Sequence, residues 1–327
     1  MIEHLQIYIG DRFDPYENLA IEKLLLDKVD PATCILYLWQ NQNTVVIGRN
    51  QNAWAECRTS LLEQEGGKLA RRLSGGGAVF HDLGNLNFTF LVRDEDYDVD
   101  RQLSVIQEAC RLTGITAVKS GRNDLLAEER KFSGNAFYHH AGHAYHHGTL
   151  MVDVDKDKLS RYLSPPKAKL EAKGVASVRS RVVNLSELSP GLTCEKMKQL
   201  MVSAFETVYG LPAEPVTISL AQRQTVRRTA ELYGSWDYLY GAPLSFTFQC
   251  EERFSWGHIL LQLQAKGGII TAAKVYSDAM DWSLAPALEQ ALTDCPFRLD
   301  SMIEAVSVVS DKTARQVIRT LLQKQDI

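Results

Sequence analysis

The segment RRLSGGGAVFHDLGN at residues 71–85 places two arginines, a serine and three consecutive glycines before a short apolar run. A tight turn needs only one or two residues without a Cβ, so the third glycine is more than a turn requires. One interpretation is that the backbone of residues 75–77 approaches an anion closely and presents N–H groups to it, with Arg71 or Arg72 adding positive charge. The alternative is a flexible hairpin loop. A dinucleotide fingerprint is excluded because Phe80 stands where G-x-G-x-x-G needs its last glycine.

A second segment, GRNDLLAEERKFSGNAF at residues 121–137, spaces Asp124 and Lys131 seven positions apart. If the acidic residues between them form a hairpin tip, the two side chains return to neighbouring strands. A carboxylate able to hold Mg²⁺ would then face an amine able to hold phosphate. The alternative is a charged surface hairpin.

A third segment, HHAGHAYHHGTL at residues 139–150, contains five of the eight histidines. A zinc site is conceivable, but the sequence contains no H-E-x-x-H motif and no cysteine lies nearby. We expect His139, His140 and His143 to lie in a mobile loop and His147 to begin a strand that ends at Val154.

Basic residues also gather in the segment PPKAKLEAKGVASVRSRVVNL. They are Lys167, Lys169, Lys173, Arg179 and Arg181, with Glu171 as the acidic exception. The segment is either a patch for an acidic partner protein or a set of ordinary solvated side chains.

Hydrophobic periodicity predicts the elements that position these segments. Helices are expected at Leu19–Val29, Ala53–Glu65, Val99–Leu112 and Glu195–Tyr209, and strands at Ile35–Trp39, Thr44–Ile47 and Asn85–Val92. The glycine segment therefore lies between two strands. Because strands and helices mix without strict βαβ alternation, the fold class is predicted to be α+β.

The chain has 327 residues, which favours two domains, and we expect a boundary in the aromatic turn segment YGSWDYLYGAP. The predicted domains are residues 1–236 and 237–327. A net charge of −4 argues against a dedicated nucleic-acid binder, and no apolar run is long enough to cross a membrane. Six scattered cysteines without a C-x-x-C pair, and a first segment unlike a signal peptide, predict a cytoplasmic location.

The order of RRLSGGGAVFHDLGNLNFTF, GRNDL, RKFSGNA, HHGTLMVDVD and KGVASVRSRVVNL resembles that in two-domain lipoate-protein ligases. The resemblance runs from about residue 11 to residue 188 and continues more weakly into the last 80 or so residues. It implies a large mixed-sheet catalytic domain shared with biotin ligases and octanoyl transferases, followed by a small α+β accessory domain. It also implies that lipoate is activated with ATP and Mg²⁺ to lipoyl-AMP and then transferred to a lysine.

The resemblance carries over to particular residues of this sequence. Lys131 would contact both the lipoyl carboxylate and the phosphate, and Asp124 would assist with Mg²⁺ or the adenylate. ATP and the adenylate would lie along Arg72, Gly77, Ala78, Val79 and Phe80. Ser74, Gly75, Gly76, His81 and Asn85 would line the lipoate pocket, with Leu19, Val46 and Phe88 as candidates for its apolar tunnel.

The implied partners are lipoyl domains of 2-oxoacid dehydrogenase E2 subunits and the glycine cleavage H protein, and we expect a monomer. Two other functions stay open. One is a lipoyl or octanoyl transferase that takes an acyl group already activated, and the other is a non-catalytic adenylate-binding sensor. An intact Lys131 together with the glycine segment argues against the sensor, because binding alone would tolerate their loss.

Overall fold

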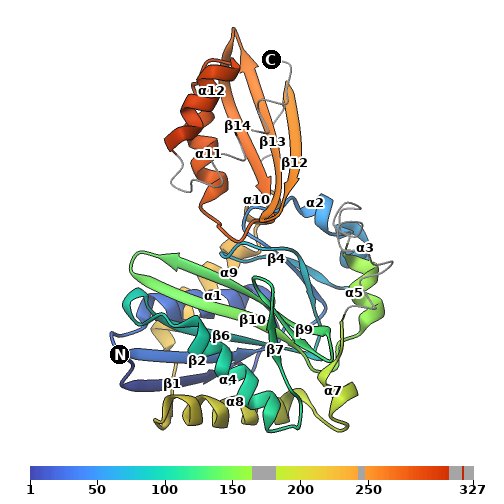
Figure 1. The fold of residues 1–327 in the computed structure, drawn as a ribbon, viewed down its shortest axis with the longest axis vertical. Helices are drawn as coiled ribbons and strands as arrows, with labels where there is room; N and C mark the ends of the chain where they lie inside the picture. Colours follow the sequence, from blue (N-terminus) through green and yellow to red (C-terminus); the bar gives the residue numbers. More distant parts are fainter. Residues whose placement is uncertain (164–181, 242–246, 309–318, 320–327) are drawn as a thin grey trace.

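A computed structural model describes residues 1–163, 182–241, 247–308 and 319 of the chain. Its largest element is an eight-stranded mixed sheet with the order β11-β1-β2-β6-β10-β9-β8-β7, in the lower part of Figure 1. Strand β1 pairs in parallel with both β11 and β2, and the other neighbours are antiparallel. The strands are β1 (His4–Ile9), β2 (Thr33–Trp39), β6 (Asn85–Arg93), β7 (Val118–Ser120), β8 (Asp124–Ala127), β9 (Arg130–His140), β10 (His143–Met151) and β11 (Ala213–Pro215).

Helices cover both faces of this sheet. Helices α1 (Pro15–Lys28) and α9 (Leu220–Tyr233) pack on one face, and α4 (Val99–Arg111) and α8 (Cys194–Tyr209) pack on the other. Helix α1 begins four residues before the predicted Leu19, because Asp14 caps the backbone N–H groups of Tyr16 and Glu17 and Pro15 suits the first turn. The mixed α+β architecture expected from the sequence is confirmed.

A small sheet with the order β4-β3-β5 lies beside the large one. Its strands are β4 (Lys68–Arg71), β3 (Thr44–Ile47) and β5 (Val79–His81), so the glycine segment does connect two strands. The helix predicted over Ala53–Glu65 is instead two short helices, α2 (Ala53–Glu56) and α3 (Thr59–Gln64). The break falls at Cys57, whose extended backbone forms a bridge with Leu163.

The histidine-rich segment is also not the loop that we expected. It forms a β-hairpin in which His139 and His140 end β9 and His143 begins β10. Ala141 and Gly142 make the turn, both with positive φ. Strand β10 ends at Met151, with His147 in its interior.

The C-terminal part forms a separate unit in the upper part of Figure 1. Strands β12 (Phe248–Phe254), β13 (Gly257–Lys266) and β14 (Ile269–Ser277) form an antiparallel sheet, and α11 (Leu284–Leu292) and α12 (Leu299–Ala305) accompany it. Its core is its own, with Leu261, Leu263 and Leu288 among its buried residues. Helix α10 (Trp236–Tyr240) lies where the domain boundary was predicted.

The remaining described helical elements are short: η1 (Asp94–Asp96), α5 (Lys156–Tyr162), α7 (Leu185–Leu188) and η3 (Val306–Val308). None of the helices in the described ranges is both long and apolar enough to span a bilayer. The basic side chains from Lys167 to Arg181 lie outside the described residues.

Candidate active site

A cavity of about 980 Å³ lies between the glycine segment, the large sheet and the C-terminal unit. Of the predicted site residues, those that line it are Arg72, Gly76, Gly77, Ala78, Val79, Phe80, His81, Asn85, Asp124 and Lys131. Ser74 and Gly75 lie behind this wall and are buried. The structure thus brings together residues from the segment between β4 and β5 and from β5, β6, β8 and β9.

Two of the three tunnel candidates, Leu19 and Val46, line the cavity. The third prediction is wrong, because Phe88 is packed in the core between the sheet and helices α4 and α8. Side chains alternate between the two faces of a strand. On β6 the cavity is lined by Asn85 and Asn87, so Phe88, which follows Asn87, points to the opposite face.

Lys131 and Asp124 form an ion pair with 2.7 Å between Nζ and Oδ1. They lie on the β9 and β8 strands of a hairpin whose tip, Glu128 and Glu129, has positive φ. Lys131 also lies close over Gly134, where a Cβ would be 2.9 Å from Nζ. A side chain at position 134 would therefore displace the ammonium group, a requirement that the sequence alone did not reveal.

Asp124 is also the carboxylate that could hold a metal ion at this site. The described ranges contain no cluster of three histidine, cysteine or acidic residues arranged for a metal. Mg²⁺, however, is often held by one or two carboxylates together with substrate phosphates. Asp124 could therefore hold Mg²⁺ together with substrate phosphates.

The two arginines of the glycine segment have different roles. Arg71 donates to the backbone carbonyls of Tyr238 and Leu239, and so fixes α10 against β4. Arg72 is buried, lines the cavity and donates to the carbonyls of Gly75 and Gly77. Burial lowers the pKa of Arg72 to about 10, so the guanidinium stays charged at neutral pH. Arg72 therefore brings a fixed positive charge to the cavity wall while it shapes the glycine segment.

The three glycines face different neighbours. A Cβ on Gly75 would be 2.3 Å from the carbonyl oxygen of Ala279, and Gly76 has a φ of +89°. The Gly76 N–H donates to the same Ala279 oxygen at 3.0 Å. In the part of the chain that the structure describes, the N–H groups of Gly77 and Ala78 donate to no backbone carbonyl. The first two glycines therefore allow the C-terminal unit to dock, and the third begins a pair of available N–H donors.

Gly48 packs against the glycine segment, and the sequence analysis did not identify it. A Cβ there would be 2.3 Å from the Gly76 carbonyl oxygen. Only a residue without a side chain fits under the segment at this point.

A buried polar chain that the sequence analysis missed lies at one end of the cavity. Glu22 of α1 accepts hydrogen bonds from His147 Nδ1 at 2.8 Å and from the Thr89 hydroxyl at 2.7 Å. The other nitrogen of His147 is 2.8 Å from Ser74 Oγ, which accepts from Arg72 Nε at 3.1 Å. Since Glu22 accepts the Nδ1 proton, Nε2 of a neutral ring accepts the serine hydroxyl. This series of hydrogen bonds links helix α1 and strand β10 of the large sheet to Arg72.

The C-terminal unit closes the mouth of the cavity with the segment after β14. Met280 lies against Gly76 and accepts from Asn123 Nδ2 at 3.7 Å. Arg122 donates to the carbonyl of Ser255 at 2.7 Å. Both units therefore contribute residues to one cavity.

Comparisons with known proteins agree with this architecture. The family "Lipoyl protein ligase A/B catalytic domain" matches residues 14–206. The family "Bacterial lipoate protein ligase C-terminus" matches residues 244–322. The fold and the cavity thus define a member of the lipoyl protein ligase A/B class with a C-terminal accessory unit.

Individual relatives narrow this class. Lipoate-protein ligase A from Blochmanniella pennsylvanica (strain BPEN) is 40% identical over 307 residues, which is 91% of either chain. The chain belongs to the lipoate-protein ligase A family, and its activity is that of an ATP-binding lipoate-protein ligase.

Solved structures show the same fold. The crystal structure of P. falciparum LipL1 in complex with lipoate covers 98% of this chain and 100% of its own, with a TM-score of 0.87 and 25% identity. A lipoate-protein ligase A bound with ATP covers 74% of this chain and 99% of its own, with a TM-score of 0.64 and 24% identity. A bi-partite ligase from Thermoplasma acidophilum, described with its E2 lipoyl domain, covers 76% of this chain and 100% of its own, with a TM-score of 0.65 and 24% identity.

Proposed function

We propose that this ligase joins lipoate to AMP and then transfers the lipoyl group to one lysine of an acceptor domain. The observation that carries the proposal is the Lys131–Asp124 pair in a cavity that also contains the available N–H groups of Gly77 and Ala78. A cation and fixed N–H donors are what a reaction that gathers charge on carboxylate and phosphate oxygens requires.

The chemistry proceeds in two balanced steps. A carboxylate is a poor acyl donor, so a lipoate oxygen first attacks the α-phosphorus of ATP and pyrophosphate leaves. The acceptor lysine amine then attacks the carbonyl carbon of lipoyl-AMP, forms an amide, loses a proton and expels AMP. Lys131 is not a nucleophile in either step; its ammonium holds the carboxylate against the phosphate. Arg72 contributes positive charge to the site, and its hydrogen bonds to Gly75 and Gly77 hold the glycine segment in shape.

Two of the ligands are supported by related structures, which contain ATP in one case and lipoic acid in another. The proposed ATP and adenylate residues are Arg72, Gly77, Ala78, Val79, Phe80, Asp124 and Lys131. The proposed lipoate residues are Ser74, Gly75, Gly76, His81, Asn85 and Lys131, of which Ser74 and Gly75 act from behind the wall. Mg²⁺ would be held by Asp124 and would neutralise phosphate charge.

The acceptor is a lipoyl domain. The structure title of the archaeal ligase names its E2 lipoyl domain, which supports this class of partner. For this chain we propose the lipoyl domains of 2-oxoacid dehydrogenase E2 subunits and the glycine cleavage H protein, with the ligase acting as a cytoplasmic monomer.

The C-terminal unit is proposed to serve activation rather than transfer. Its residues Ala279 and Met280 lie against Gly75 and Gly76, which would shield an adenylate from water. A bulky lipoyl domain, in contrast, can present its lysine only if the mouth of the cavity is open. Activation and transfer would therefore use two arrangements of the units.

The proposal is tested by lipoate-dependent exchange of pyrophosphate into ATP, followed by intact-mass analysis of a lipoyl domain. We expect exchange in the presence of Mg²⁺ and one lipoyl group added per acceptor. If the protein modifies the acceptor only from supplied lipoyl-AMP, it is a transferase, and if it binds lipoyl-AMP without modifying the acceptor, it is a sensor.

A further inference from the structure

His81 lines the cavity and has a buried ring nitrogen for which the described part of the chain provides no hydrogen-bond partner. The residue is 3% exposed, and the nitrogen without a partner among the described residues is Nε2. Its other ring nitrogen, Nδ1, is 3.2 Å from Asn41 Nδ2. Whether Nε2 is a donor or an acceptor therefore depends on which way the Asn41 amide is oriented.

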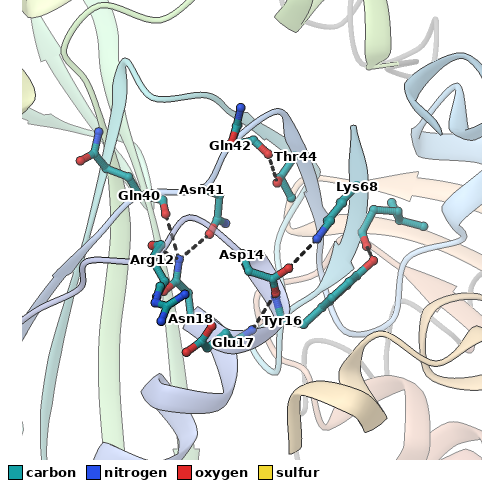
Figure 2. Close-up of polar contacts among 11 residues, drawn as sticks. Arg12, Asp14, Tyr16, Glu17, Asn18, Gln40, Asn41, Gln42, Thr44 and Lys68 are labelled. Atoms are coloured by element: carbon teal, nitrogen blue, oxygen red, sulfur yellow. Dashed lines mark hydrogen bonds and ion pairs between the residues drawn. The ribbon is translucent and has the colours of Figure 1, made fainter. Parts of the chain in front are cut away.

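The orientation is fixed by a second asparagine, Asn18 of α1. Its Nδ2 donates to the backbone carbonyls of Gln40 at 2.8 Å and Arg12 at 3.1 Å. Carbonyl oxygens only accept, so this end of the amide must be nitrogen. Asn18 Oδ1 then accepts from the Tyr37 hydroxyl at 3.1 Å. Figure 2 shows Asn18 between Gln40 and Asn41.

The orientation of the Asn41 amide follows from that of Asn18, and Asn41 is fully buried. The two hydrogens of Asn18 Nδ2 are shared among three acceptors, the third of which is Asn41 Oδ1 at 3.0 Å, so the Asn41 nitrogen faces His81. His81 Nδ1 is consequently an acceptor, and the single proton of the neutral ring is on Nε2. Burial, together with Arg72 and His147, lowers the pKa of His81 to about 3, so the ring is neutral at working pH. The result is a preset, buried N–H donor on a residue that lines the cavity.

His81 lies at the opposite end of the cavity from Lys131. Its ring contacts Trp39 edge-on, at 6.3 Å between centroids. Strand pairing then runs from Trp39 on β2 to Asn87 on β6, from Asn87 to Thr149 on β10, and from the Thr149 hydroxyl to the Gly134 N–H on β9, beside Lys131. Three strand spacings place Trp39, which contacts His81, about 14 Å from Gly134, which lies beside Lys131. A carboxylate held at Lys131 therefore directs the far end of its acyl chain toward His81.

We propose that the Nε2–H of His81 donates to a sulfur of the lipoyl ring and thereby selects lipoate over acids that end in hydrocarbon. This inference rests on the proposed function. The sulfurs are the hydrogen-bond acceptors at that end of lipoate, whereas octanoate ends in a methyl group. A hydrocarbon end leaves a buried N–H without a partner, which is unfavourable, and sulfur, although a weak acceptor, relieves it.

The first experiment compares three acids with the wild-type protein in pyrophosphate exchange. Besides lipoate and octanoate it uses 5-cyclopentylpentanoate, which keeps the chain and the five-membered ring but replaces both sulfurs by methylene groups. We expect kcat/KM for lipoate to exceed that for the cyclopentyl acid by about tenfold, mainly through KM. Equal values for these two acids overturn the inference. Absence of exchange with every acid overturns the proposed function instead.

The second experiment removes or restores the donor. His81→Leu is expected to lower kcat/KM for lipoate about tenfold and for the two carbon acids less than threefold, while His81→Gln, which again places an amide N–H there, recovers part of the difference. An equal loss with all three acids would show that His81 acts on the shared carboxyl group and overturns the inference.

The third experiment changes the proton position without touching the cavity wall. Asn41→Asp keeps the acceptor for Asn18 but offers His81 an oxygen, so the ring proton moves to Nδ1 and Nε2 becomes an acceptor. We expect the preference for lipoate over the cyclopentyl acid to fall toward one at pH 8. Gln42→Glu, an equal charge change at an exposed neighbouring position, is the matched control and should keep the preference. An undiminished preference in Asn41→Asp overturns the positioning role of Asn41.

Discussion

The floor and the rim of the cavity are built in opposite ways. The floor consists of buried side chains on paired strands, such as Asn85, Asn87 and His147, with α1 contributing Glu22 from behind. The rim consists of the glycine segment and the segment after β14, which meet through backbone contacts such as that from Gly76 to Ala279.

This difference corresponds to what each region is proposed to bind. The acyl group stays the same through both half-reactions, so fixed side chains on a sheet suit it. The nucleotide end must accept ATP, release pyrophosphate and then admit a protein domain, so a rim of loops that can separate suits it. Lys131 lies where the two regions meet.

The largest expected effect is at that meeting point. Lys131→Ala should lower exchange, and also transfer from supplied lipoyl-AMP, by about 10²–10³, as when one donor is lost from an oxyanion hole. The free energy of unfolding should change little, because the ion pair with Asp124 is about a third exposed and such pairs contribute about 0–1 kcal/mol. Steady-state kinetics measures the exchange and transfer rates, and urea unfolding measures the free energy of unfolding.

Lys119→Ala is the matched control, since Lys119 also pairs with an aspartate, at 3.0 Å, but lies on β7 away from the cavity. Normal turnover by a folded Lys131→Ala protein would contradict the assigned role.

A smaller effect is expected from a change confined to the rim. Gly75→Ala places a Cβ 2.3 Å from the Ala279 oxygen, and overpacking of this kind costs about 1–3 kcal/mol, so exchange should fall about tenfold. Transfer from lipoyl-AMP should be retained, and small-angle scattering should show a more extended particle.

Gly10→Ala controls for the added methyl group, because its nearest neighbours would be at 3.4 Å. If Gly75→Ala extends the particle and exchange stays at the wild-type rate, the C-terminal unit does not serve activation.

The smallest effect is a pH dependence that originates in the buried ring of His81, on β5 beside the floor. The folded pKa of His81 is lowered to about 3, whereas an unfolded histidine titrates near 6.5. The unfolded state therefore binds the proton first as the pH falls, and stability is lost between about pH 6.5 and 3. At pH 5.5 the free energy of unfolding should be about 1 kcal/mol lower than at pH 7 from this group.

Urea unfolding at both pH values measures this difference. His81→Gln should have the smaller pH dependence, and the exposed His4→Gln should behave as the wild type. Identical pH profiles for all three proteins would contradict the buried, neutral state of His81.

Local sequence patterns predicted the parts of the site that are local in the chain. The loop between β4 and β5 was predicted because three glycines are adjacent, and the hairpin that pairs Asp124 with Lys131 followed from their spacing. Distant partners could not be predicted this way: Glu22 and His147 are 125 positions apart and meet only because α1 packs behind β10. Phe88 was misassigned because an apolar residue on a strand fits either a core or a tunnel.

The docking of the C-terminal unit has a consequence for how this chain could be recombined. The hydrogen bonds from Gly76 to Ala279, from Ser277 to Asn50, from Arg122 to Ser255 and from Asn50 to Trp282 each use a main-chain atom of that unit. Main-chain atoms are present whatever the side chains are. Hybrid proteins that carry a relative's C-terminal unit should therefore assemble, provided that glycine is kept at positions 75 and 76.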